Sequence, residues 1–88
     1  MPRMVITHDV VDIERWLKGK EERASALGAV GSDVTDYVAR DGSNSIAVSA
    51  TIHDMGALQA LLDAPPPEVA ALMEAHGVVP PLTVYVEQ

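Results

Sequence analysis

Two histidines stand where a β-strand pattern gives way to a helix pattern. His8 ends the run Met4 to His8, His53 ends the run Ser45 to His53, and an aspartate follows each. A neutral imidazole near a helix N-terminus can act as a general base, because the helix dipole disfavours the protonated ring. We therefore predict that His8 and His53 are catalytic groups that remove a proton from a carbon acid or phenol. The alternative is that they only mark the ends of strands.

A metal site would need a third ligand, and Asp9, Asp54 or His76 is available in principle. No His-x-x-x-His spacing occurs, and capping or turn formation explains both aspartates. His76 ends a helix pattern, where the dipole favours a cation. Cysteine is absent, which excludes disulfides and thiol nucleophiles. We predict no metal and no cofactor.

Aromatic residues are few, namely Trp16, Tyr37 and Tyr85. Trp16 falls on the apolar stripe of a helix pattern, whereas each tyrosine falls in a strand, on the face opposite the neighbouring valines. We predict that all three contact a ligand. Core packing is the alternative for Trp16, and a dimer interface is the alternative for the tyrosines.

Length and charge limit the classes of protein. The 88 residues allow one domain, 1–88, with a thin aliphatic core that pairing with a second copy would extend. The formal net charge of -7 argues against nucleic acid and anionic membranes as partners. No signal peptide or membrane-spanning run is recognisable, so we expect a complete cytoplasmic protein.

The first helix pattern begins a few residues after His8 and must hold that end of the strand in place. Asp12 is the expected N-cap, and apolar residues then recur at helical spacing as far as Leu27. Gly19 interrupts this pattern and predicts a kink or a close contact. The charged residues from Lys18 to Arg23 are expected on a solvated face.

The rest of the chain predicts a hairpin, a broken helix and a last strand. Val34 to Arg40 and Ser45 to His53 flank a turn, Pro65 to Pro67 interrupt the second helix, and Leu82 to Glu87 form the final strand. The order βαββαβ is typical of a ferredoxin-like α+β fold, a four-stranded antiparallel sheet with two helices on one face. We further expect the first and third strands to be parallel neighbours, which would bring His8 and His53 to one edge.

The run from His8 to Trp16, HDVVDIERW, resembles the opening of many small bacterial proteins of the dimeric α/β-barrel superfamily, although Ile13 replaces their usual aromatic residue. Looser agreement covers Asp41 to Val48, Ile52 to Asp54, and Met73 to Val78. The resemblance implies a homodimer whose sheets pack face to face, with an apolar pocket in each subunit. The superfamily includes cofactor-free antibiotic-biosynthesis monooxygenases, polyketide cyclases, muconolactone isomerases and haem-degrading enzymes.

These observations lead to one functional hypothesis and one rival. We expect a homodimer that binds a mostly apolar small molecule, including aromatic ones, and transforms it by histidine acid–base chemistry as a monooxygenase, cyclase or isomerase. The rival is a non-enzymatic ligand-sensing or interaction module of the same fold. A cavity within the subunit that touches a histidine would favour the enzyme.

Overall fold

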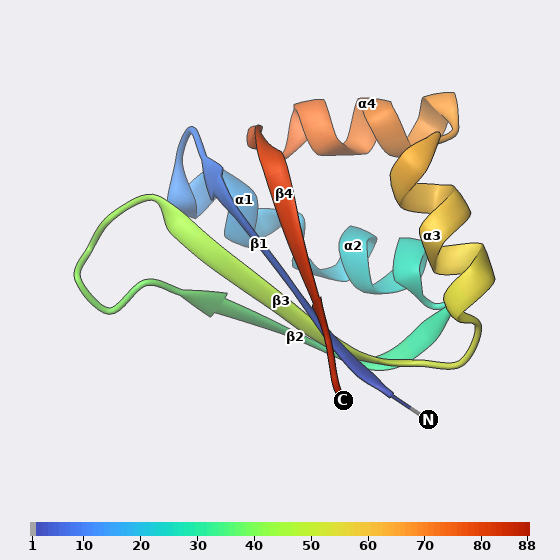
Figure 1. Cartoon of the computed structure of the whole chain (residues 1–88). Coiled ribbons are helices and arrows are strands. Elements are labelled where there is room, and N and C mark those ends of the chain that lie inside the picture. The colour runs from blue at the N-terminus through green and yellow to red at the C-terminus, as the bar shows by residue number, and fades with distance from the viewer. Residues whose placement is uncertain (1) are drawn as a thin grey trace.

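The computed structural model describes residues 2–88 and contains one sheet with helices on one of its faces (Figure 1). The predicted ferredoxin-like α+β fold is confirmed, with each predicted helix divided in two. In chain order the elements are β1 (Arg3–Val10), α1 (Ile13–Lys18), α2 (Lys20–Leu27), β2 (Gly31–Val38), β3 (Ser45–Ile52), α3 (Met55–Asp63), α4 (Pro67–Ala75) and β4 (Val78–Val86).

Strand direction corrects one prediction. The sheet order is β2-β3-β1-β4, and each neighbouring pair is antiparallel. The expectation that the first and third strands run parallel is therefore wrong, because the β2–β3 hairpin returns β3 against β1. His8 lies opposite Ile46 at the start of β3, whereas His53 follows the far end of that strand. At about 3.4 Å per residue, the two histidines lie roughly 24 Å apart along the sheet.

The helix ends follow the predicted local chemistry. Asp12 Oδ1 accepts a hydrogen bond from the backbone N–H of Glu14 at 3.1 Å, and Asp54 Oδ1 accepts one from Ala57 at 3.0 Å. Both are N-cap contacts that satisfy a free donor of the first turn. Gly19 separates α1 from α2, in agreement with the predicted kink.

Alternate residues of the central strands build the core. Apolar side chains of β1 and β3 that point toward the helices meet Trp16 and Leu58 there; the buried members are Met4, Ile6, Val10, Ile46, Val48, Ala50 and Ile52. Full burial of a large aliphatic side chain stabilises a fold by about 1.5–3 kcal/mol. This period-two pattern fixes which face of the sheet the helices cover.

The last strand is longer than predicted and irregular. β4 begins at Val78 rather than at Leu82, and the segment containing Pro80 and Pro81 bulges within it. The β1–β4 register passes from Thr7 opposite Thr83 to Asp9 opposite Val79, so His8 faces the bulge. Because proline has no N–H to donate, the hydrogen-bond ladder is interrupted beside His8.

Candidate functional site

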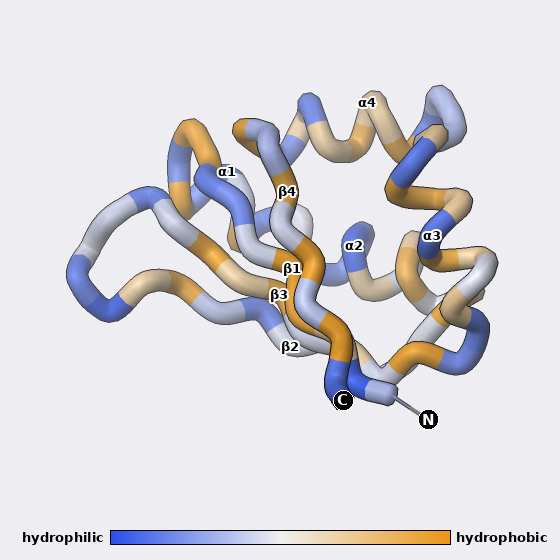
Figure 2. The backbone as a smooth tube through the Cα atoms, viewed as in Figure 1, coloured by the Kyte–Doolittle hydropathy of each residue, from blue (hydrophilic) through white to orange (hydrophobic). Residues whose placement is uncertain are grey.

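A cavity of about 710 Å³ lies between the sheet and helices α2, α3 and α4. Such a volume is typical of small-molecule sites. The walls are mostly apolar, and Figure 2 shows hydrophobic residues recurring along α3, α4 and β4. Its polar lining residues are His8, Arg23, Gln59 and Asp63. The cavity therefore suits a largely apolar molecule.

His8 is a basic group on this wall with a defined tautomer. Its Nδ1 donates a hydrogen bond to the backbone carbonyl of Asp9 at 2.8 Å, because a carbonyl oxygen can only accept. The lone pair of the neutral ring is then on Nε2. Burial lowers the pKa of His8, the bond to Asp9 opposes that shift, and the charge of Arg23 adds to it. His8 is thus a neutral hydrogen-bond acceptor near pH 7.

The β4 bulge also gives His8 access to the other face of the sheet. A smaller hollow of about 450 Å³ lies on that face, and its lining includes His8, Tyr37, Pro80 and Pro81. His8 lines both spaces. Bulges commonly redirect a side chain beside a functional site, and this one leaves the imidazole at an opening in the sheet.

Trp16 supports the site from behind rather than lining the cavity. Its side chain is fully buried and meets the His8 ring edge to face, with centroids 6.4 Å apart. The Arg23 guanidinium lies 4.0 Å from the centroid of the Trp16 ring. The indole therefore holds two cavity residues in place, and the core alternative describes it better than the predicted ligand contact.

Arg23 belongs to a buried ion pair that the sequence prediction missed. Arg23 is only 8% exposed, and its Nη2 lies 3.6 Å from Oδ2 of Asp36. The carboxylate of Asp36 is itself almost completely buried. The expectation that Arg23 sits on a solvated helix face is wrong, because its side chain is buried against Asp36 of β2. One signal was present in the sequence: Asp36 stands between Val34 and Val38 in the helix-facing series of β2, where a charge requires a buried partner.

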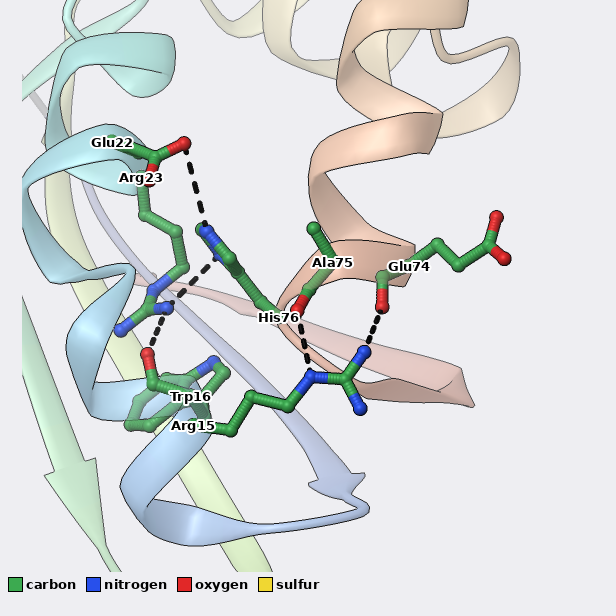
Figure 3. Close-up of polar contacts among 7 residues, drawn as sticks. All are labelled: Arg15, Trp16, Glu22, Arg23, Glu74, Ala75 and His76. Atoms are coloured by element: carbon green, nitrogen blue, oxygen red, sulfur yellow. Dashed lines mark hydrogen bonds and ion pairs between the residues drawn. The ribbon is translucent and has the colours of Figure 1, made fainter.

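His76 completes this cluster (Figure 3). Arg23 Nη1 donates to the main-chain oxygen of Trp16 and lies 3.2 Å from Nδ1 of His76. Arginine has only donors, so His76 must accept and is neutral, with its proton on Nε2. Burial and the Arg23 charge lower the pKa of His76. The prediction that His76 is a cationic partner of the helix end is therefore wrong.

His53 lies outside the cavity. It is exposed after β3, and its Nε2 is 2.9 Å from the hydroxyl oxygen of Ser32. The joint site of His8 and His53 is excluded by their positions at opposite ends of the sheet. The contact with Ser32 fits the alternative in which His53 marks a strand end.

Both tyrosines lie on the sheet face that carries no helix within residues 2–88. Tyr37 pairs with Ala47 and Tyr85 with Val5, and their side chains are 48% and 58% exposed. The predicted face is confirmed. Tyr37 lines the smaller hollow, and its hydroxyl lies 3.1 Å from Oγ of Ser49. Neither tyrosine lines the larger cavity.

Comparison with known proteins identifies the fold. No protein-family model and no curated protein matches the chain. Among solved structures, it is similar to an antibiotic biosynthesis monooxygenase (12% identity, TM-score 0.65, covering 100% of this chain and 97% of the other). It is also similar to a putative antibiotic biosynthesis monooxygenase from Deinococcus radiodurans (14% identity, TM-score 0.62, covering 100% of this chain and 91% of the other). A third similar structure is SnoaB from Streptomyces nogalater, a cofactor-independent oxygenase (17% identity, TM-score 0.66, covering 99% of this chain and 92% of the other). The chain thus has the fold of these proteins along its whole length. Within residues 2–88, no helix is long and apolar enough to cross a membrane.

Proposed function

We propose that this protein binds a mostly apolar small organic molecule in the cavity between sheet and helices, and that His8 removes a proton from it. The observation that carries the proposal is the placement of a neutral imidazole, with its Nδ1 proton committed to Asp9, on the wall of an apolar cavity. A neutral imidazole that faces a mostly apolar cavity is suited to general base catalysis.

A phenol, an enol or an activated C–H bond is the chemistry that fits this base. Transfer of the proton to Nε2 of His8 would leave a delocalised organic anion, and the buried charge of Arg23 on the same cavity wall would stabilise it. Such electron-rich anions can react with O2 without a metal or flavin. The structural likeness to a cofactor-independent oxygenase, SnoaB, favours oxygenation over cyclisation or isomerisation.

The protein is further proposed to act as a homodimer in the cytoplasm, with the uncovered sheet faces packed together. That face carries the two exposed tyrosines together with Val5, Thr35, Thr83 and Ala47. A mixture of aromatic, aliphatic and hydroxyl groups is typical of an interface that retains some water. Pairing would also cover the smaller hollow beside His8.

The rival function is a non-enzymatic binding module. Such a module would hold its ligand between chains over a filled core, whereas here a cavity within the chain reaches a histidine. This feature favours an enzyme.

Oxygen consumption tests the proposed chemistry. The purified protein is incubated in air with 1,3-dihydroxynaphthalene, an enolisable bicyclic phenol, and O2 uptake is followed with an electrode. We expect turnover above the uncatalysed rate, reduced about 100-fold or more in His8→Asn, because general base catalysis contributes a factor of about 10²–10⁴. Binding without O2 uptake or product would favour the rival module, and equal rates for both proteins would overturn the role of His8.

A further inference from the structure

Helix α4 and the second half of α3 form the roof of the cavity and are loosely held. α3 is anchored near its beginning by Leu58, which is 1% exposed and belongs to the core. Beyond that point Leu62 still packs against the core, and the other inward residues line the cavity; they are Leu61, Val69, Leu72 and Met73. α4 contains no buried residue. Elements with few buried contacts are the ones that open most easily.

The far end of this roof is tied to α1 and α2 by polar contacts (Figure 3). Arg15 on α1 donates from Nε to the carbonyl of Ala75 and from Nη2 to that of Glu74, both at 2.8 Å. The Ala75 carbonyl is one that the end of a helix leaves free, whereas the Glu74 carbonyl also accepts from the backbone N–H of Gly77 at 3.0 Å. The guanidinium thus joins α4 to α1 across about sixty residues of sequence.

His76, the residue after α4, makes the second tie. It is only 5% exposed, its ring packs directly on Gly19, and a Cβ at that position would overlap the imidazole. Its Nδ1 accepts from Arg23, which is held in turn by the buried pair with Asp36. This contact requires a neutral ring.

We propose that the α3–α4 roof is a lid over the cavity, and that Arg15 and His76 form a latch that holds the lid closed only while His76 is neutral. The role of the lid in ligand entry rests on the proposed function. The opening of the lid, however, is a property of the ligand-free protein. Protonation would remove the acceptor at Nδ1 and place a cation against a buried arginine.

The charges around His76 fix the direction of this response. Arg15 from α1 and Arg23 from α2 oppose a proton on the ring, while Glu22 from α2, at 4.0 Å from Nε2, favours it. Asp36 from β2 lies behind Arg23 and is already paired, and Glu74 from α4 faces Arg15 with its main-chain carbonyl. Burial is the largest effect and lowers the pKa of His76. The latch is therefore closed at neutral pH and is released in acid, below the usual range of histidine.

Hydrogen exchange of the ligand-free protein tests the latch. Mass spectrometry at pH 7.5 and pH 5.0, corrected for the intrinsic exchange rates, should show at least tenfold faster exchange of α4 amides in acid and little change in β1 and β3. His76→Asn keeps an acceptor at the Nδ1 position but cannot be protonated, so its α4 should stay protected at both pH values. The control His53→Asn, which removes an exposed histidine, should behave like the wild type.

Equal α4 protection at both pH values in the wild type would overturn the proposal, as would an unchanged pH response in His76→Asn. If that variant does not fold, NMR titration of the wild type decides. The α4 amide shifts must then follow the protonation of the His76 ring, and a different midpoint would contradict the latch. Because no ligand is present, failure here is distinct from failure of the proposed binding function.

Discussion

The imidazole of His8 meets the indole of Trp16 edge to face, at 6.4 Å between centroids and 84° between ring planes. Trp16 is the only tryptophan of the chain, so its fluorescence reports directly on the candidate base. The Arg23 guanidinium lies against the same indole. This three-residue contact joins the proposed chemistry to the fold, because the indole is part of the core and its two neighbours line the cavity.

Acidification should quench Trp16, because a protonated imidazole is a strong quencher of a neighbouring indole. Burial lowers the pKa of His8, so the emission should fall at a lower pH than that at which an exposed histidine titrates. The measurement is a fluorescence titration of the folded protein, with circular dichroism to exclude unfolding. The transition should vanish in His8→Asn; an identical curve in that variant would show that another group is titrating.

Replacing Arg23 should destabilise the fold strongly. Arg23→Met leaves Asp36 buried without its cation, and breaking a buried pair costs about 3–5 kcal/mol. The double variant Arg23→Met with Asp36→Leu removes both charges and should recover most of the loss. Urea unfolding measures the free energies. A nearly neutral single variant would contradict the buried ion pair.

Gly19→Ala should lower the free energy of unfolding by about 1–3 kcal/mol, although alanine is the better helix former, because the new methyl group would overlap the His76 ring. In a His76→Ala background the same substitution should be neutral or stabilising. Thermal unfolding of the four proteins forms a double-mutant cycle. Equal effects in both backgrounds would show that the imidazole does not pack on Gly19.

The uncovered sheet face should mediate pairing. Tyr85→Glu places a charge on the proposed interface, in the edge strand β4, and should convert a dimer to a monomer, because an unpaired charge is costly to bury there. Leu17→Glu, at an exposed position on α1, is the matched control and should leave the mass unchanged. Light scattering coupled to gel filtration gives the mass. A monomeric wild type, or a dimeric Tyr85→Glu, would contradict the proposed pairing.

Local patterns predicted much of the fold. The caps at Asp12 and Asp54, the break at Gly19 and the face of each tyrosine follow from short-range chemistry and period-two alternation. These features depend on residues near in sequence. For that reason they were predictable without a structure.

Features that depend on long-range geometry were not predicted. The pairing of His8 with His53 failed because strand direction is set by the whole chain and not by the similar sequences around the two residues. Arg23 and His76 were interpreted as surface charges, since nothing local shows that α2 and the end of α4 meet. A charge at Asp36 within an apolar series was the one clue to a buried partner.

Titration with 2-naphthol, followed by the fluorescence of Trp16, tests whether the cavity beside His8 binds an apolar ligand. We predict saturable binding that Leu72→Arg, which places a charge in the cavity, weakens at least tenfold, while Leu17→Glu on the outside of α1 has no effect. If 2-naphthol does not bind, or binds equally well to Leu72→Arg, the cavity is not the ligand site and the proposed function is contradicted.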